Sequence, residues 1–290
     1  MSVPQIMTVD LEREAPGVYA SYLIFSGDEV AVVDVGPAKT IDVLVDRLRR
    51  INRRVKVLIT HIHLDHAGGI GHLVEEIEVE AVYVHPRAVK HLIDPSILWT
   101  SSIEVLGSQA LKYGRPKPVP KELLKPLKDK EVITIGEHKI MAIYAEGHAS
   151  HQVAYLLNDV LFPGDAVGEI YEGNVLILTP PPLLAGQAIA TLDRFIRYNP
   201  KHLAVPHFGI YEDAVGLIKR YKAKLISHLK EAKLSIIQGS IERMKRYILE
   251  EEENKKALEI LMSRGYGDPV EYAERCAKGL LEYVEKYGWD

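Results

Sequence analysis

Side chains that bind metal ions are concentrated in one short stretch of this sequence, THIHLDHAGG at residues 60–69. Three imidazoles and one carboxylate fall within six residues, and nitrogen and oxygen ligands without thiolate suit zinc best, with iron or manganese also compatible. In an extended backbone, side chains two residues apart share a face, so His61, His63 and Asp65 can point the same way. A lone histidine is usually packed or solvated, whereas four potential ligands at this spacing predict a metal site.

Three later segments each carry one histidine or aspartate beside glycine or proline, after a predicted strand or an apolar run. His148 follows a predicted strand at residues 140–144, Asp165 follows a short apolar run, and His207 ends a predicted strand at residues 202–205. One segment cannot supply every ligand of a two-metal site, so further ligands are expected from such strand ends. Each of the three is a weak signal alone, and together with residues 60–69 they predict a centre of two divalent metal ions.

These motifs resemble those of the metallo-β-lactamase superfamily, the binuclear hydrolases with a His-x-His-x-Asp-His signature. The resemblance covers residues 16–208. It implies an α/β (α+β) fold, the four-layer αββα sandwich, in which two mixed sheets pack face to face with helices outside. It also implies that Asp165 bridges the two metals. The other implied ligands are His61, His63 and His148 for the first metal, and Asp65, His66 and His207 for the second.

The chemistry expected of such a centre is hydrolysis. Two divalent metals about 3.5–4 Å apart hold a bridging hydroxide at neutral pH, because metal binding lowers the pKa of water. That hydroxide would attack a small ester, a thioester, or a related acyl or phosphate bond. Asp65 is the expected catalytic residue, since its carboxylate can orient the nucleophile and carry a proton to the leaving group. The main prediction is therefore a metal-dependent hydrolase that acts on a small molecule.

Four further side chains are candidates for shaping the substrate pocket, namely His151, Trp99, Tyr171 and Tyr211. Some lactonases of this fold carry a catalytic tyrosine at the position where this chain has Gly168. The glycine disfavours a lactonase activity, unless Tyr171 or Tyr211 takes the place of that tyrosine. We also expect residues 95–130 and the first helix of the C-terminal tail to border the metal site.

The elements that must position these residues alternate between strand-like and helix-like patterns. Runs of β-branched and aromatic residues at 19–25 and 30–35 surround Ser26-Gly27-Asp28 and predict a hairpin. Residues 95–130 fit no regular element and are predicted to be a long insert loop. Helical spacing of apolar residues predicts helices at 40–50, 69–77 and 185–198, and short apolar runs predict strands at 55–60, 81–84, 132–135, 140–144, 153–157 and 202–205.

The C-terminal tail differs in composition from the rest of the chain. Residues 209–290 hold 15 acidic and 15 basic side chains and have the pattern of successive helices. We therefore divide the chain into a catalytic domain at 1–208 and a helical extension at 209–290. A stripe of Tyr272, Cys276, Leu280 and Val284 predicts a helix that buries one face. In position the tail resembles the C-terminal helices of glyoxalase II enzymes, which bind a glutathione thioester, and it is also a candidate for homodimer contacts.

Composition excludes several classes of protein. The single cysteine, Cys276, rules out a disulfide framework and a Cys-based zinc site. The net charge of −4 disfavours a nucleic-acid partner, and no apolar run is long enough for a membrane span. The first 17 residues lack the apolar core of a signal peptide, so a cytoplasmic location is expected. Asparagine and glutamine total ten of 290 residues, which is typical of a thermophilic source.

Two other activities stay open on the sequence alone. Sulfur dioxygenases share the implied fold and most of these ligands, so a non-haem iron persulfide dioxygenase is the first alternative. A ribonuclease or phosphodiesterase is the second, and the acidic balance of the chain argues against it. The seven intact ligand positions argue against a binding protein without catalytic activity.

Overall fold

Two six-stranded β-sheets form the centre of the molecule, in a computed structural model that describes residues 4–289. The first sheet runs in the order β1-β2-β3-β4-β5-β6, antiparallel from β1 to β3 and parallel from β3 to β6. Every residue of β3 is buried, as expected of a strand covered on both faces. The strands are β1 (Gln5–Asp10), β2 (Ala20–Ser26), β3 (Glu29–Val33), β4 (Arg54–Leu58), β5 (Val79–Val84) and β6 (Leu124–Pro126).

The second sheet runs in the order β14-β13-β10-β9-β8-β7. All of its neighbouring strands are antiparallel except β10 and β13, which pair in parallel. The carboxyl ends of β8, β10 and β13 each lead into a segment with one candidate ligand. The strands are β7 (Val132–Ile135), β8 (His138–Tyr144), β9 (Val153–Leu157), β10 (Val160–Phe162), β13 (His202–Val205) and β14 (Gly209–Tyr211).

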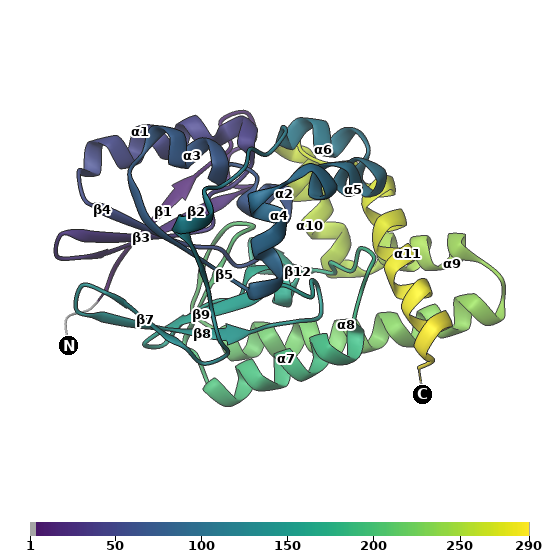
Figure 1. Cartoon of the computed structure of the whole chain (residues 1–290). Helices are drawn as coiled ribbons and strands as arrows, with labels where there is room; N and C mark the ends of the chain where they lie inside the picture. Colours follow the sequence, from purple (N-terminus) through teal and green to yellow (C-terminus); the bar gives the residue numbers. More distant parts are fainter. Residues whose placement is uncertain (1–3, 290) are drawn as a thin grey trace.

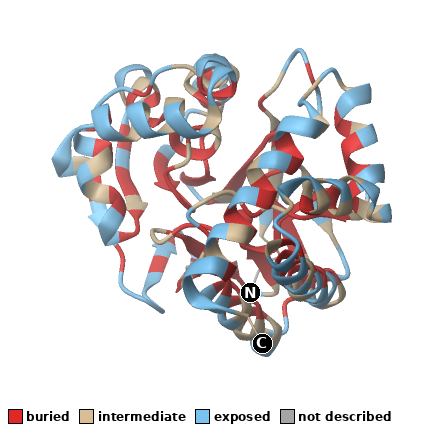
Figure 2. Ribbon diagram, turned by 90° about the vertical axis from the view of Figure 1, so that its right-hand side faces the viewer, coloured by how far each residue is buried: buried red, intermediate tan, exposed pale blue. Residues whose placement is uncertain are grey.

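The two sheets pack face to face through a core of large side chains. Tyr22 and Leu58 of the first sheet belong to the same buried cluster as Tyr155 and Phe162 of the second. All four are at most 2% exposed. The rings of Tyr22 and Phe162 meet edge to face, with centroids 5.5 Å apart. Figure 2 shows this buried interior in red, with exposed residues on the outer helices and loops.

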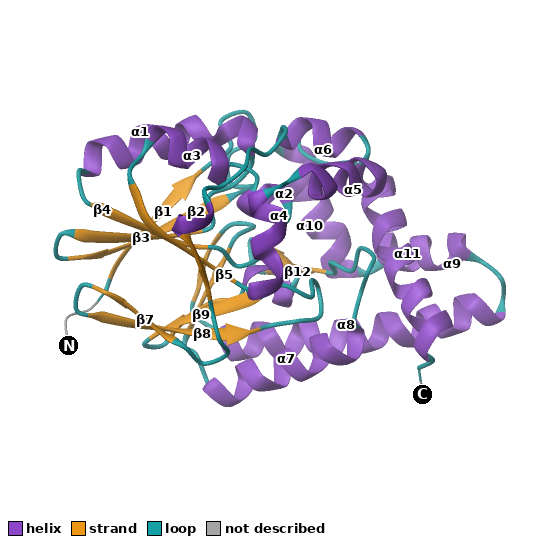
Figure 3. Ribbon diagram, in the orientation of Figure 1, coloured by secondary structure: helices purple, strands orange, loops and turns teal. Residues whose placement is uncertain are grey.

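Helices cover the outer face of each sheet (Figures 1 and 3). Helices α1 (Ile41–Ile51) and α3 (Ile70–Glu76) lie outside the first sheet, and α7 (Ala185–Tyr198) and α8 (Ala214–Ile237) lie outside the second. In α1 the buried residues are Ile41, Leu44, Val45 and Leu48, at the spacing that the sequence showed. The predicted four-layer αββα sandwich is confirmed, and the predicted hairpin is β2–β3.

Residues 95–130 are more regular than predicted. The segment contains α5 (Ser96–Leu106), α6 (Ser108–Tyr113), a 3-10 turn η3 (Lys121–Leu123) and strand β6. The prediction of an insert loop was wrong because α5 buries none of its residues and so has no apolar stripe to reveal it. Between Gly114 and Pro120 the chain is irregular, as its prolines require.

Several short elements complete the catalytic body. They were not predicted, because elements this short give little periodic signal. They are α2 (Leu64–Ala67), α4 (Val89–Ile93), the hairpin of β11 (Glu169–Tyr171) and β12 (Asn174–Leu176), and the 3-10 turns η1 (Ala38–Thr40), η2 (Pro86–Ala88) and η4 (Gly164–Val167).

The tail is helical, as predicted, and packs against the body. After α8 come α9 (Ile241–Glu250), α10 (Glu252–Ser263) and α11 (Pro269–Tyr287). The predicted stripe on α11 is buried, and it faces this chain's own body. Ile177 donates its N–H to Asn254 Oδ1 at 3.0 Å and accepts the Tyr272 hydroxyl at 2.8 Å. One apolar cluster contains residues on both sides of the proposed boundary at 209, which itself stays a prediction. A homodimer through the tail also stays a prediction.

No helix among residues 4–289 combines the length and the apolar character needed to cross a membrane.

Candidate metal centre

The segment after β4 carries four of the candidate ligands, two in a loop and two in α2, and is held by backbone contacts. Strand β4 ends at Leu58 and α2 begins at Leu64. The carbonyl of His66 accepts the N–H groups of Val35 and Gly36, at 2.9 and 3.0 Å, which ties α2 to the end of β3. A Cβ atom at Gly68 would lie 2.3 Å from the carbonyl oxygen of Leu64, so only glycine fits this turn.

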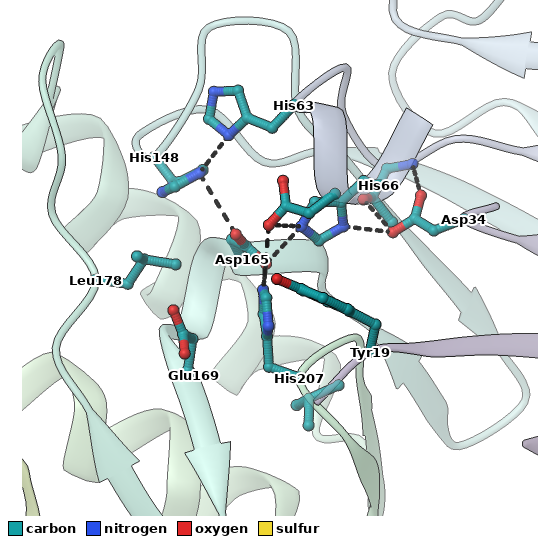
Figure 4. A network of polar contacts seen from close by, with 12 residues as sticks. Tyr19, Asp34, His63, His66, His148, Asp165, Glu169, Leu178 and His207 are labelled. Carbon is teal, nitrogen blue, oxygen red and sulfur yellow. Dashed lines mark hydrogen bonds and ion pairs between the residues drawn. The ribbon is translucent and has the colours of Figure 1, made fainter. Parts of the chain in front are cut away.

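The first ligand group joins His61 and His63 with His148 and Asp165, whose metal-binding atoms all lie within 4.8 Å of one another. His63 Nδ1 is 3.0 Å from both His61 Nε2 and His148 Nε2. Asp165 Oδ2 is 3.8 Å from His61 Nε2 and 3.5 Å from His148 Nε2. Three imidazole nitrogens and one carboxylate oxygen therefore converge from three separate segments. Figure 4 shows His63, His148 and Asp165 of this group.

The second group consists of Asp65, His66 and His207. Asp65 Oδ2 lies 3.7 Å from His66 Nε2 and 3.9 Å from His207 Nε2. Asp165 also faces this group, because its Oδ1 is 3.3 Å from His66 Nε2 and 3.5 Å from His207 Nε2. Each oxygen of Asp165 thus faces a different group, as expected of a carboxylate shared by two cations.

Buried atoms without hydrogen-bond partners show that these residues fit metal ions. His66 Nε2, His207 Nε2 and Asp165 Oδ1 are buried, and none makes a hydrogen bond. Buried polar atoms in proteins are normally paired, and leaving one unpaired costs about 1–3 kcal/mol. Cations held between the groups would satisfy all three atoms.

The electrostatics of the site also favour bound cations. Burial lowers the pKa of His63 to about 3 and that of His148 to about 4, so both rings are neutral and their lone pairs are free at pH 7. Burial acts in the same direction on His207, but the carboxylates of Glu169 and Asp165 outweigh it and raise its pKa to about 9. The carboxylates of this region therefore attract positive charge, which a divalent metal supplies in place of protons.

Asp34 supports the second group and was not predicted. Its Oδ2 lies 2.9 Å from His66 Nδ1 and accepts the Thr60 hydroxyl at 2.7 Å, while its Oδ1 accepts the Thr60 N–H at 2.7 Å. A carboxylate at this position keeps the hydrogen on Nδ1, so the Nε2 lone pair of His66 faces the second group. The signal that could have pointed to it is an aspartate directly after a buried strand and two residues before a glycine, Gly36.

A cavity of about 270 Å³ adjoins both groups, and we call it the site cavity. It reaches from His63, Asp65 and Asp165 to α5, α6 and the start of α11. Apolar side chains such as Leu98 and Val105 form part of its wall. Among its lining residues, all within the described chain, Arg275 is the only lysine or arginine. A second depression near Arg53 and Glu80 contains none of the candidate ligands.

Comparison with known proteins identifies the family. Residues 15–207 match the family described as the metallo-beta-lactamase superfamily. The chain belongs to the metallo-β-lactamase superfamily. It is 27% identical over 203 residues to the metallo-beta-lactamase fold-containing protein ST1585 of Sulfurisphaera tokodaii, covering 68% of this chain and 75% of that protein. The crystal structure of ST1585 superimposes with a TM-score of 0.74 at 22% identity, over 97% of this chain and 100% of that one, which shows the same fold.

Two more distant relatives have named activities. The acyl-coenzyme A thioesterase MBLAC2 of Gallus gallus is 28% identical over 44% of this chain and 46% of its own length. A hydroxyacylglutathione hydrolase of Aliivibrio salmonicida is 27% identical over 53% of this chain and 50% of its own length. The chain thus spans about half the length of these two relatives. As a member of this superfamily, it is a hydrolase.

In this superfamily member the predicted substrate residues divide into two pairs. His151 and Tyr171 line the site cavity, whereas Trp99 and Tyr211 do not. The Tyr171 hydroxyl donates to Glu169 Oε2 at 2.9 Å, and the Tyr211 hydroxyl donates to the Ile170 carbonyl at 3.1 Å. Neither phenol is therefore free to replace a tyrosine at Gly168.

The segments that border the cavity were predicted in part. Residues of α5 and α6 line it, as expected of the 95–130 segment. The tail also lines it, but through the end of α10, the loop before α11, and α11 itself. The expectation for the first tail helix was wrong, since no residue of α8 lines the cavity within the described chain. Sequence order does not predict which helix of a tail folds back over a site.

Proposed function

We propose that this chain hydrolyses a thioester or ester of a small acyl group, with two divalent metal ions held by the two ligand groups. The observation that carries the proposal is the position of Asp165, with one oxygen facing each group, beside a cavity with both apolar and charged walls. Zinc is the expected metal, because the donors are imidazole nitrogens and carboxylate oxygens without thiolate.

The ligands proposed for the first metal are His61, His63, His148 and one oxygen of Asp165. Those for the second are Asp65, His66, His207 and the other oxygen of Asp165. When bound, two such metals supply a hydroxide nucleophile at neutral pH and polarise the substrate carbonyl.

The protein's own residues bind and orient the substrate. Apolar side chains of α5 accept the acyl group and exclude water from it. The guanidinium of Arg275 binds an anionic part of the substrate through its fork of N–H donors. Asp65 lines the cavity and accepts a proton as the nucleophile forms, then returns it to the leaving group. The thioester is favoured by the names of the two relatives, both of which act on thioesters with anionic carriers.

Metal-dependent turnover of model substrates tests this function. The protein is stripped with a chelator, reloaded with zinc, and assayed with butyryl-coenzyme A and p-nitrophenyl butyrate. We expect hydrolysis only after reloading, and a loss of at least about 100-fold in kcat for Asp165→Asn, which disturbs both groups. Asp159→Asn serves as the matched control, since this half-buried aspartate pairs with Lys201 and does not line the site cavity.

Two results would overturn the proposal. One is zinc-loaded protein that cleaves bis(p-nitrophenyl) phosphate but neither acyl substrate. The other is purified protein that holds one iron and consumes oxygen with a persulfide, which would identify the dioxygenase instead.

A further inference from the structure

Three tyrosine hydroxyls form a connected group on the wall of the site cavity. Tyr19 precedes β2, Tyr113 ends α6, and Tyr266 lies in the loop between α10 and α11. The Tyr19 hydroxyl donates to the Tyr113 hydroxyl at 3.2 Å, and the Tyr266 hydroxyl donates to it at 3.4 Å. Gln109 donates its amide to the Tyr266 hydroxyl in turn. Segments far apart in the sequence thus meet at one phenol oxygen.

Tyr113 receives hydrogen bonds in this group and gives none. A phenol has one O–H donor and two lone pairs, and the hydrogen bonds from Tyr19 and Tyr266 occupy both lone pairs of Tyr113. None of the hydrogen bonds found among residues 4–289 has the Tyr113 hydroxyl as its donor, and the side chain of Gln109 also hydrogen-bonds to it as a donor. Burial, reinforced by the charge of Asp65, raises the pKa of Tyr113 well above its usual value, so the phenol keeps that hydrogen at neutral pH.

The other tyrosines of the cavity have their hydrogens committed. Five tyrosines line it, and Tyr19 and Tyr266 both donate to Tyr113. Tyr171 donates to Glu169, and Tyr272 donates to the carbonyl of Ile177 at 2.8 Å. Tyr113 is therefore the lining tyrosine that can donate a hydrogen bond to a molecule in the cavity.

Tyr19 connects the hydroxyl of Tyr113 to the candidate metal centre. Tyr19 packs edge to face on His207, with ring centroids 5.6 Å apart. Figure 4 shows the hydroxyl end of Tyr19 pointing toward Asp165 and His207. Tyr113 lies one hydrogen bond beyond this hydroxyl and lines the same cavity as Asp65 and Asp165. A molecule bound in the site cavity can therefore contact both this phenol and members of the two ligand groups, such as Asp65 and Asp165.

We propose that Tyr113 is a catalytic residue that donates a hydrogen bond to the carbonyl oxygen of the scissile acyl group as negative charge develops on it. This inference rests on the proposed acyl hydrolysis. Hydroxide adds to the carbonyl carbon, the carbonyl π pair moves onto the oxygen, and that oxygen is stabilised by the phenol hydrogen. Collapse of the tetrahedral anion then breaks the bond to sulfur or oxygen, and the leaving group departs with the electron pair. The phenol keeps its proton throughout.

The test is Tyr113→Phe, which keeps the ring and removes only the hydroxyl. In zinc-loaded protein with p-nitrophenyl butyrate and butyryl-coenzyme A, we expect kcat to fall by about 100-fold, the usual loss for one oxyanion donor, while KM changes by less than about threefold. Metal content and melting temperature should match those of wild type. Tyr247→Phe, which removes a phenol paired with Ser227 outside the cavity, is the matched control and should keep wild-type kinetics.

A binding measurement tests the same hydroxyl without turnover. Butylphosphonate, a tetrahedral anion, should bind Tyr113→Phe about 100-fold more weakly than wild type, in proportion to the loss in kcat/KM, whereas the product butyrate should bind both about equally. Replacing Tyr113 with 3-fluorotyrosine keeps the hydroxyl and strengthens it as a donor, so kcat should be retained or raised. A residue that only supported the fold would not follow donor strength in this way.

Failure of the inference and failure of the proposed function look different. Wild-type protein that hydrolyses neither acyl substrate would refute the proposed function and, with it, the catalytic role of Tyr113; the phosphonate measurement would then report only whether this hydroxyl binds a tetrahedral anion. Active wild-type protein with an equally active Tyr113→Phe variant would refute the assignment of Tyr113 alone. Equal phosphonate affinities would refute it as well. So would a rise in KM with kcat unchanged, which would indicate a contact that is equally strong in the ground state and the transition state.

Discussion

At the scale of single residues, the site depends on carboxylates that hold imidazoles in place. Asp165 faces both ligand groups, and Asp34 holds His66 from the side away from the cavity. The ligand residue types could be recognised from their spacing, since His61, His63, Asp65 and His66 are local in the chain. Asp34 could not, because its partners Thr60 and His66 are distant in sequence and meet it only through the parallel pairing of β3 with β4.

Asp34→Asn should weaken metal binding. The amide that replaces one oxygen donates hydrogen bonds, so it would oppose the hydrogen on His66 Nδ1 and turn the ring or its tautomer away from the second group. We expect metal affinity at that group to fall by about 10–100-fold, as for other carboxylates behind a metal-binding histidine. Competition with a chromophoric chelator measures this affinity, with Asp159→Asn, outside the site cavity, as control. Equal affinity in the variant and the wild type would show that Asp34 does not orient His66.

At the scale of elements, the strand ends bring ligands together and the neighbouring helices form the cavity. The strands were recognisable from their apolar runs, and the bounds of β7, β9, β13 and α7 agree with the predicted ranges. Helix α5 could not be recognised in the sequence. Amphipathic spacing reveals a helix only where one face is buried, and α5 buries none of its residues. Which helix lines the cavity depends on contacts across the molecule, such as those that dock α11 beside β12.

A buried ion pair between β3 and β4 should make stability depend on pH. Lys56 Nζ lies 2.9 Å from Glu29 Oε2, and both side chains are at most 10% exposed. Burial would raise the pKa of Glu29, but the hydrogen bonds from Lys56 and from the Gly136 N–H outweigh it and lower that pKa. A lowered carboxyl pKa stabilises the folded state fully above the unfolded pKa of about 4.3, and this stabilisation is lost as pH falls through the folded pKa.

Glu29→Gln should therefore lower the free energy of unfolding by about 1.5–3 kcal/mol at pH 7, the usual value of a hydrogen bond to a charged group. The difference from wild type should shrink as pH falls from 5 to 3. Urea unfolding at pH 7 and at pH 3 measures this difference, and the exposed Glu259→Gln should show no difference from wild type at either pH. A loss that is the same at pH 3 and pH 7 would contradict the role of the ionised pair.

Arg275 of α11 should select substrates with an anionic group. Its nearest acidic partner, Glu271 Oε2, is 3.8 Å away, too far for a strong ion pair, so the guanidinium is available to a ligand. Arg275→Met should raise KM for butyryl-coenzyme A by about tenfold or more, the loss of one charge-assisted contact, and leave KM for neutral p-nitrophenyl butyrate unchanged. Lys278→Met changes a cation on the same helix that is 62% exposed, and should affect neither KM. Equal effects on the two substrates would exclude anion recognition.

At the scale of the whole molecule, the tail and the body share one apolar core. Tyr221 of α8 donates its hydroxyl to the Leu178 carbonyl at 3.1 Å, and Thr179 donates to the Cys276 carbonyl at 3.1 Å. A Cβ atom at Gly279 would lie 2.0 Å from the Thr179 carbonyl oxygen, so the backbones of α11 and the body are in contact. The composition of the tail indicated a separate extension, but helices that look amphipathic alone can bury their stripes against the rest of the chain.

A chain that ends at residue 208 should therefore not fold cooperatively. Its truncation exposes the apolar surface that α8, α10 and α11 cover and leaves backbone groups of Ile177 unpaired. We expect a broad thermal transition with binding of a hydrophobic dye, measured by circular dichroism and fluorescence against the full chain. A soluble fragment with a sharp transition would instead support two independent domains with a boundary at 209.

The sequence by itself determined the ligand types, the strands and helices with a clear period, and through them the family and fold. These features are local, because metal-ligand spacing and apolar periodicity follow from backbone geometry within a few residues. The tertiary structure alone decided that Asp165 faces both groups, that Asp34 holds His66, that α11 and not α8 lines the cavity, and that the hydroxyls of Tyr19 and Tyr266 meet that of Tyr113. Each of these depends on which distant side chains meet, and that is set by the packing of the whole chain.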